Sequence, residues 1–231
     1  MKVTAVKKPE KKPRISVNKL AEYLEAISTR RRKIVEDAKY PEKFIVTRYK
    51  DARGVINNFL SNNIDEEFVL DTIIEFENKE SDTEFQEQDN RLSGESLESI
   101  LEADISLLDG CEVSTYEDKN ELIEISGVDI SVNPDLLVTK IVDGVRAIGA
   151  MKLHISKTNQ LSDESQKVVA VMLYLYVGKF IIGKGEAENP KLCLSFDVFK
   201  QCIECCPTSY KHRIKKIEAA CEEIGLWWDK L

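Results

Sequence analysis

The alternation of apolar and polar residues is clearest between Glu121 and Lys157, where it predicts β-strands. β-Branched and aliphatic side chains recur there at every second position, as expected for strands with one buried face. Asp143 and Gly144 separate two apolar runs, and this dipeptide favours a two-residue type I′ turn because both residues tolerate a positive φ. The pattern therefore predicts an antiparallel hairpin that turns at Asp143-Gly144.

A two-residue turn fixes which residues of the hairpin face each other. Counting outward from Asp143-Gly144, Val138 faces Gly149 and Asp135 faces Lys152, with Ala150 next along the same face. Cross-strand neighbours have Cβ atoms about 5 Å apart. We therefore expect a carboxylate and an ammonium group to meet at the open end of the hairpin.

Elsewhere the apolar spacing is mostly helical. The helices that we expect cover approximately residues 18–40, 50–60, 64–77, 91–108, 162–176, 195–206 and 209–231, and short strands are expected at 179–182 and 192–194. Helices and strands that alternate in this way predict a mixed α/β fold, with a mixed β-sheet flanked by helices. The expected organisation is a flexible basic arm (1–15), a helical N-terminal region (16–77), an acidic loop (78–90) and a core (91–231).

The hairpin carries a short motif. Pro134 and Asp135 lie on one strand, and Ala150-Met151-Lys152 lies on the next. This arrangement resembles the PD-(D/E)XK motif of restriction-endonuclease-like and RecB-type nucleases. The position that holds Asp or Glu in that family is Ala150 here, so the acid of the motif is replaced.

The resemblance implies a metal-dependent phosphodiesterase, with DNA as a more favoured substrate than RNA. Asp135 would bind Mg²⁺ or Mn²⁺, and Lys152 would serve the attacking water or the charge on phosphorus. Gly94 and Glu98 resemble a helical pair of RecB-type nucleases, which makes Glu98 the candidate second metal ligand. Nucleases of this class act in phage defence and DNA processing, often beside an ATPase or another protein subunit, and oligomers occur.

Two other interpretations stay open. A nuclease-fold protein without catalysis, acting as a nucleic-acid-binding or protein-interaction module, is favoured by Ala150, because one carboxylate binds Mg²⁺ weakly. The pattern is also short enough to arise by chance, and an Asp opposite a Lys can be a simple cross-strand ion pair. The sequence alone does not tell a natural from an engineered alanine at position 150.

Charge is distributed unevenly along the chain. Residues 1–60 hold 16 Lys/Arg and 7 Asp/Glu, whereas residues 61–135 hold 3 and 23. The basic N-terminal part is a candidate for contact with a phosphate backbone. The candidate nucleic-acid contacts are Arg30, Arg31, Arg32, Lys33, His154 and Lys157. The four consecutive cations at 30–33 could contact phosphate or, alternatively, pair with carboxylates among the acidic residues 61–135.

The remaining composition bears on location. The first residues carry charges where a signal peptide needs an apolar stretch, and the longest apolar run, 168–177, is about half of a membrane span. We therefore expect a cytoplasmic protein without a membrane partner, whose six Cys are thiols. Cys202, Cys205 and Cys206 are expected to pack in the core rather than bind an iron–sulfur cluster.

Overall fold

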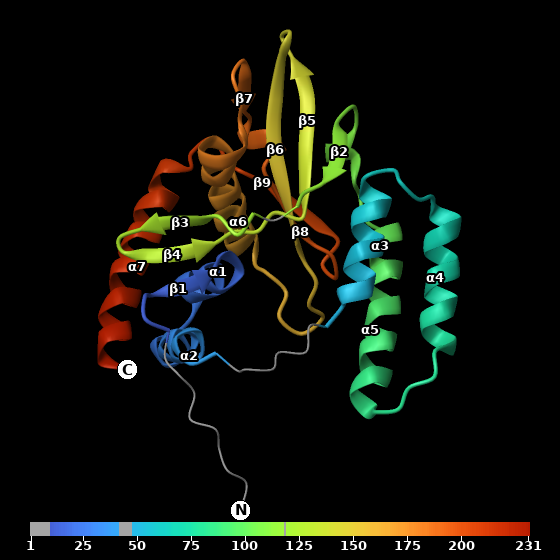
Figure 1. The fold of residues 1–231 in the computed structure, drawn as a ribbon, viewed down its shortest axis with the longest axis horizontal. Coiled ribbons are helices and arrows are strands. Elements are labelled where there is room, and N and C mark those ends of the chain that lie inside the picture. Colours follow the sequence, from blue (N-terminus) through green and yellow to red (C-terminus); the bar gives the residue numbers. More distant parts are fainter. Residues whose placement is uncertain (1–9, 42–47, 118) are drawn as a thin grey trace, which may run out of the picture. The chain divides into compact units, whose positions relative to one another are not determined.

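The fold is mixed α/β, as predicted. The computed structural model describes residues 10–41, 48–117 and 119–231. Its contacts divide the chain into two compact units, each assembled from separate segments (Figure 1). Unit 1 comprises Met1–Val46, Asn120–Val132 and Ser209–Leu231, and unit 2 comprises Thr47–Lys119 and Asn133–Thr208. This division differs from the sequence-based one in two respects. Residues 47–77 belong with the large sheet, and residues 120–132 and 209–231 belong with the N-terminal helices.

Unit 1 packs three helices with a three-stranded sheet. Its elements are β1 (Arg14–Ser16), α1 (Val17–Glu25), α2 (Ser28–Lys39), β3 (Leu122–Ile125), β4 (Val128–Ser131) and α7 (Lys211–Lys230). The strand order is β1-β4-β3, with β1 parallel and β3 antiparallel to β4. Residues 10–15 were expected in a flexible arm, but they are held by β1 and by Lys12, which contacts Glu124 and Asp129 at 2.7 Å. Residues 1–9 of that arm lie outside the described residues.

The helix predicted from residue 18 to residue 40 is two helices. Ser16 caps the first by accepting a hydrogen bond from the Lys19 amide, and the backbone becomes extended at Ala26. The break exposes the last carbonyl groups of α1, which need partners. The Arg31 guanidinium donates to two of them, on Tyr23 (3.0 Å) and Leu24 (3.1 Å), and so fixes the break.

Unit 2 is built on a larger sheet. Its helices are α3 (Lys50–Leu60), α4 (Glu66–Asn78), α5 (Glu84–Leu101) and α6 (Asp163–Tyr176), with short turns at Ser106–Leu108, Val177–Ile181 and Pro190–Leu192. Its strands are β2 (Glu112–Thr115), β5 (Leu136–Val142), β6 (Val145–His154), β7 (Glu186–Glu188), β8 (Leu194–Asp197) and β9 (Cys202–Cys205). The order is β2-β5-β6-β8-β9, and β7 also pairs with β6.

Helices cover both faces of the central strands of unit 2. Alternate residues of β5 and β6, such as Leu136 and Met151, share a core with Leu97 of α5 and Ile56 of α3. Helix α6, which is buried along most of its length, packs on β6, β8 and β9. It also connects the antiparallel strands β2, β5 and β6 to the parallel strand β8.

Three local predictions in unit 2 are wrong. The loop expected at 78–90 is helical from Glu84 onward, because Thr83 caps α5 by accepting from the Gln86 amide. The strand expected at 179–182 is a π-helical turn that continues α6. The helix expected after Ser195 is the β8–β9 hairpin. Its turn is held by the fully buried Asp197, which accepts hydrogen bonds from the amides of Leu161 (2.6 Å) and Lys200 (3.2 Å).

Candidate functional site

The hairpin of β5 and β6 has the predicted register. Asp143 (φ 50°) and Gly144 (φ 80°) both have the positive φ of a type I′ turn. Val142 pairs with Val145, and Val138 pairs with Gly149. The turn at Asp143-Gly144 determines every residue pair along the two strands. It therefore also brings Asp135 opposite Lys152.

Asp135 and Lys152 meet at the open end of the hairpin, on one face of the sheet. The Asp135 amide donates to the Met151 carbonyl at 2.8 Å, and the Lys152 Nζ lies 3.4 Å from Asp135 Oδ2. The side chains are only 9% and 15% exposed. The Lys152 ammonium also donates to the Asn133 carbonyl. The predicted geometry of this pair is therefore confirmed.

Arg53 of α3 is a third member of this site, and sequence reasoning missed it. Its Nη1 donates to Asp135 Oδ1 at 2.7 Å and to the Leu153 carbonyl at 3.3 Å. The Leu153 amide donates to Asp135 Oδ2 at 2.8 Å. Both carboxylate oxygens of Asp135 are therefore occupied by donors, two of which are cationic.

The other two positions of the predicted catalytic site, Ala150 and Glu98, take no part in the described contacts of Asp135. Ala150 is fully buried and pairs with Leu137. Glu98 is exposed and lines a groove between α4 and α5. Its neighbour Glu95 contacts Lys157 (2.6 Å) and Arg91 (2.8 Å). No described Asp, Glu, His or Cys forms a three-ligand group with Asp135.

These residues do not fit Mg²⁺ or Mn²⁺. Such hard cations need several oxygen ligands in near-octahedral geometry, and a metal at Asp135 would have to displace the Arg53 guanidinium. A different group, Asp163, Cys202 and Glu204, has ligand atoms within 4.8 Å of one another. It includes a sulfur atom, and Lys200 (2.6 Å) and Lys167 (3.8 Å) already pair with its two carboxylates.

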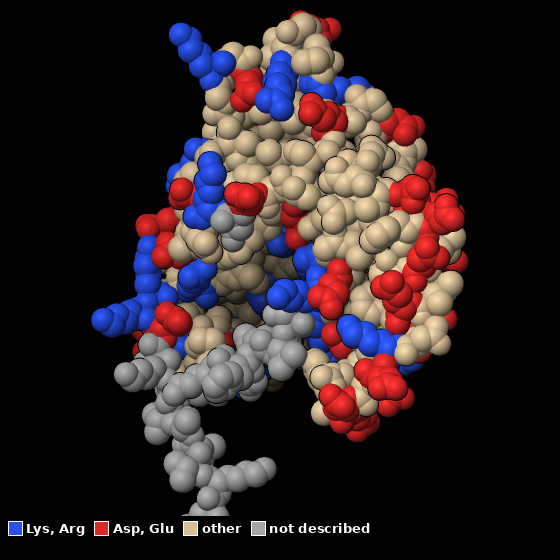
Figure 2. Space-filling model, turned by 45° about the vertical axis from the view of Figure 1, so that its right-hand side comes forward, with Lys and Arg blue, Asp and Glu red and all other residues tan. Residues whose placement is uncertain are grey.

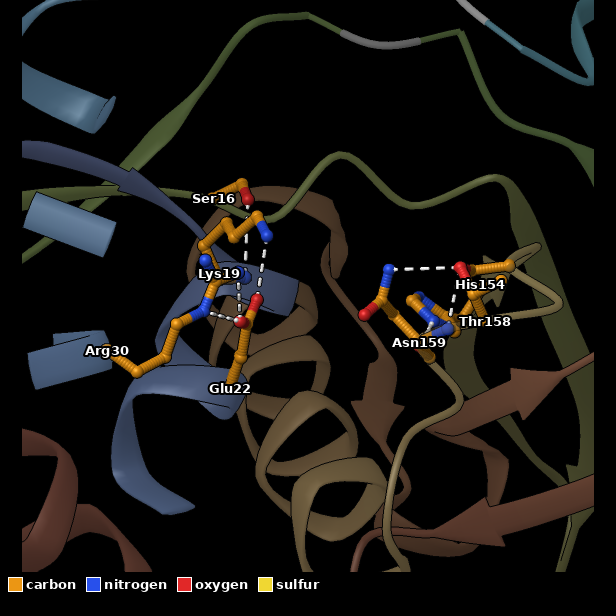
Figure 3. Close-up of polar contacts among 8 residues, drawn as sticks. Ser16, Lys19, Glu22, Arg30, His154, Thr158 and Asn159 are labelled. Carbon is orange, nitrogen blue, oxygen red and sulfur yellow. Dashed lines mark hydrogen bonds and ion pairs between the residues drawn. The ribbon is translucent and has the colours of Figure 1, made fainter. Parts of the chain in front are cut away.

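Three of the four cations at 30–33 pair with carboxylates of unit 1. Arg30 and Lys19 both contact Glu22 (Figure 3), and Lys33 contacts Glu36 and Asp37. Arg31 reaches Glu223 at 3.2 Å. Partial burial raises the pKa of Glu22, but the hydrogen bonds from Lys19 and Arg30 outweigh it and hold the pKa below its usual value. None of these carboxylates belongs to the acidic residues 61–135, which were the predicted alternative partners.

Arg32 is the fourth cation, and it makes a different contact. Its guanidinium lies 6.0 Å from the centroid of the Trp227 ring, and the Lys230 ammonium lies 5.8 Å from the same centroid. In the described parts of the chain, neither Arg32 nor Lys230 forms an ion pair with a carboxylate. Two exposed cations and a half-buried indole thus form a cluster, which we call the Trp227 cluster.

The two candidate nucleic-acid contacts of unit 2 both have partners within the chain. A ring nitrogen of His154 lies 2.6 Å from the Asn159 carbonyl oxygen, and the two residues lie together at the end of β6 (Figure 3). Lys157 pairs with Glu95. Both side chains are thus engaged in contacts within unit 2.

No family model matches the chain, and no curated protein matches it significantly. Within the described ranges, no helix is both long enough and apolar enough to cross a membrane.

Proposed function

We propose that this chain is a catalytically silent protein with a nuclease-like unit 2, and that it binds nucleic acid. The observation that carries the proposal is the state of Asp135. Its two oxygens are used by Arg53, the Leu153 amide and Lys152, and the position of the motif acid is the buried Ala150. A carboxylate whose two oxygens already accept from these donors stabilises the open end of the β5–β6 hairpin. A nuclease would instead need two free carboxylates here to bind a metal.

The charges of the two units support unit 1 as the nucleic-acid contact. Unit 1 holds 18 Lys/Arg and 13 Asp/Glu, a net charge of +5, whereas unit 2 holds 15 and 28, a net charge of −13. Phosphate backbones are attracted to the first and repelled by the second. Within unit 1, the Trp227 cluster combines an aromatic face with two cations, a combination on which unpaired bases stack and phosphates bind.

Binding of single-stranded DNA tests this part of the proposal. We expect Trp227→Ala to weaken binding of a fluorescent single-stranded oligonucleotide by about tenfold, because stacking on one aromatic ring contributes about 1 to 3 kcal/mol. Arg32→Ala should reduce the magnitude of the slope of log K against log salt concentration, where K is the binding constant, by about one, which corresponds to one lost phosphate contact. The control is Lys216→Ala, which removes an exposed cation of α7 outside the cluster. Equal effects of Lys216→Ala and the two cluster variants would show nonspecific attraction only.

A metal-dependent nuclease is the second candidate, and one observation favours it. Asp135 and Lys152 lie in contact on one face of the antiparallel hairpin, in the arrangement of the PD-(D/E)XK motif. Ala150→Glu would restore the acid of the motif. Cleavage of DNA by that variant in Mg²⁺, at a rate far above that of the parent chain, would support this candidate.

A further inference from the structure

Helices α4 and α5 of unit 2 lie side by side (Figure 1). Residues of both helices line a groove. The groove has a volume of about 410 Å³, and its floor is formed by Ile73, Phe76 and Gly94. Gly94 of α5 faces Phe76 of α4, and a Cβ atom at residue 94 would lie 3.9 Å from the Phe76 Cβ atom. The α4–α5 groove is therefore apolar at its base.

Apolar side chains continue the floor of the groove onto the surface of α4. Leu70, Ile73 and Ile74 follow the i, i+3, i+4 spacing of one helical stripe, and the carboxylate of Glu77 ends the apolar part of this stripe. Leu70 is 46% exposed and Ile74 is 54% exposed, although both are large and apolar. This stripe extends beyond the groove, so an occupant that covers it must be elongated rather than a small molecule.

Carboxylates surround this apolar strip. Glu77, Glu87 and Glu98 line the groove, and among the described residues none of them forms an ion pair with Lys or Arg. The two cations of the lining are already compensated: Arg91 contacts Glu95 at 2.8 Å, and Lys79 lies 3.8 Å from Asp51. Acidic side chains also gather on the surface around α4, on the right-hand side of Figure 2. Three carboxylates of the rim are thus available to a cationic occupant.

We propose that the α4–α5 groove docks a basic amphipathic helix of a partner protein. Leucine-like side chains of that helix would cover Leu70 and Ile74, and its Lys or Arg side chains would place their charges against the rim carboxylates. Charge complementarity selects this occupant. The rim repels nucleic acid, anionic membranes and the same groove of a second copy.

The test uses a labelled peptide of about 18 residues, or five helical turns, built from Leu, Lys and Ala with Leu at i, i+3, i+4, i+7 spacing. A peptide of the same composition in scrambled order measures nonspecific attraction. We expect anisotropy titrations to show at least about tenfold tighter binding of the amphipathic peptide. Equal affinity for both peptides would overturn the proposal.

Matched variants locate the binding site. Ile74→Ser should weaken binding of the amphipathic peptide about tenfold, whereas Phe68→Ser, a similarly exposed position (51%) on another side of α4, should not. Glu77→Gln/Glu87→Gln/Glu98→Gln should weaken it by a similar factor. Asp109→Asn/Glu117→Gln/Asp143→Asn, which removes three exposed carboxylates outside α4 and α5 and so has the same loss of charge, should have little effect. Equal losses in the variant and control sets would overturn the proposal. So would self-association that Ile74→Ser abolishes, because the occupant would then be a second copy.

Discussion

Asp135→Ala is expected to destabilise unit 2 by about 3 kcal/mol, at the lower end of the range for breaking a buried ion pair. The change leaves the Lys152 ammonium, on a side chain 15% exposed, without its carboxylate, and it removes the acceptor of the Leu153 amide. The expected destabilisation lies at the lower end because the Arg53 side chain is 34% exposed, so its guanidinium can be hydrated when the carboxylate is removed. Urea unfolding followed by circular dichroism measures the change.

A double-mutant cycle separates this ion pair from general damage to the fold. Arg53→Met removes the guanidinium and keeps an aliphatic stem, so it should cost less than Asp135→Ala. The cost of Arg53→Met should fall by about 1 kcal/mol or more when Asp135 is already alanine, because contacting residues show coupling of this size. Additive effects of the two changes would mean that the 2.7 Å contact contributes nothing to stability.

Gly149→Ala should have the other large effect, a strong destabilisation of unit 2. A Cβ atom at residue 149 would lie 2.1 Å from the carbonyl oxygen of Leu192 and 2.2 Å from the carbonyl carbon of the same residue. These are backbone atoms of a turn next to the central strand β6, so they cannot move aside as the end of a side chain can. The expected cost is at the upper end of about 1 to 3 kcal/mol for overpacking, or above it.

Gly54→Ala provides the matched control for this prediction. Gly54 lies within helix α3, and a Cβ atom there would meet no described atom within 4 Å. Replacing glycine by alanine inside a helix stabilises it by about 0.5 to 1 kcal/mol. The two variants should therefore shift the urea midpoint in opposite directions. A folded Gly149→Ala protein with an unchanged midpoint would contradict the close approach of β6 to Leu192.

The hairpin was predictable because its information is local. Asp143-Gly144 determines the turn, and the turn determines every pair up to Asp135 and Lys152. Arg53 was not predictable, because nothing in the sequence of α3 indicates that its guanidinium reaches a carboxylate 82 residues later. Chain order also gives no sign that residues 120–132 leave unit 2 to join unit 1.

Some errors came from apolar patterns that fit two structures. The run from Phe196 to Cys206 has apolar residues at helical spacing, yet Asp197 uses its carboxylate to hold a tight turn and converts the run into β8 and β9. The surroundings of Glu98 were also not predictable, because they depend on which face of α5 is covered by α4. The groove that Glu98 lines forms only where α4 packs on α5. The apolar pattern of one helix does not reveal which other helix packs on it.

The most direct test of the central claim is a cleavage assay of the parent chain in Mg²⁺ and in Mn²⁺, with linear, circular and single-stranded DNA. The compensated Asp135 and the buried Ala150 predict no cleavage above that of Lys152→Ala, which serves as the control for contaminating nucleases. The same chain should bind the single strand in EDTA as well as in Mg²⁺. Cleavage that requires the metal, and that Lys152→Ala abolishes while circular dichroism shows this variant to be folded, would contradict the silent site and establish a nuclease.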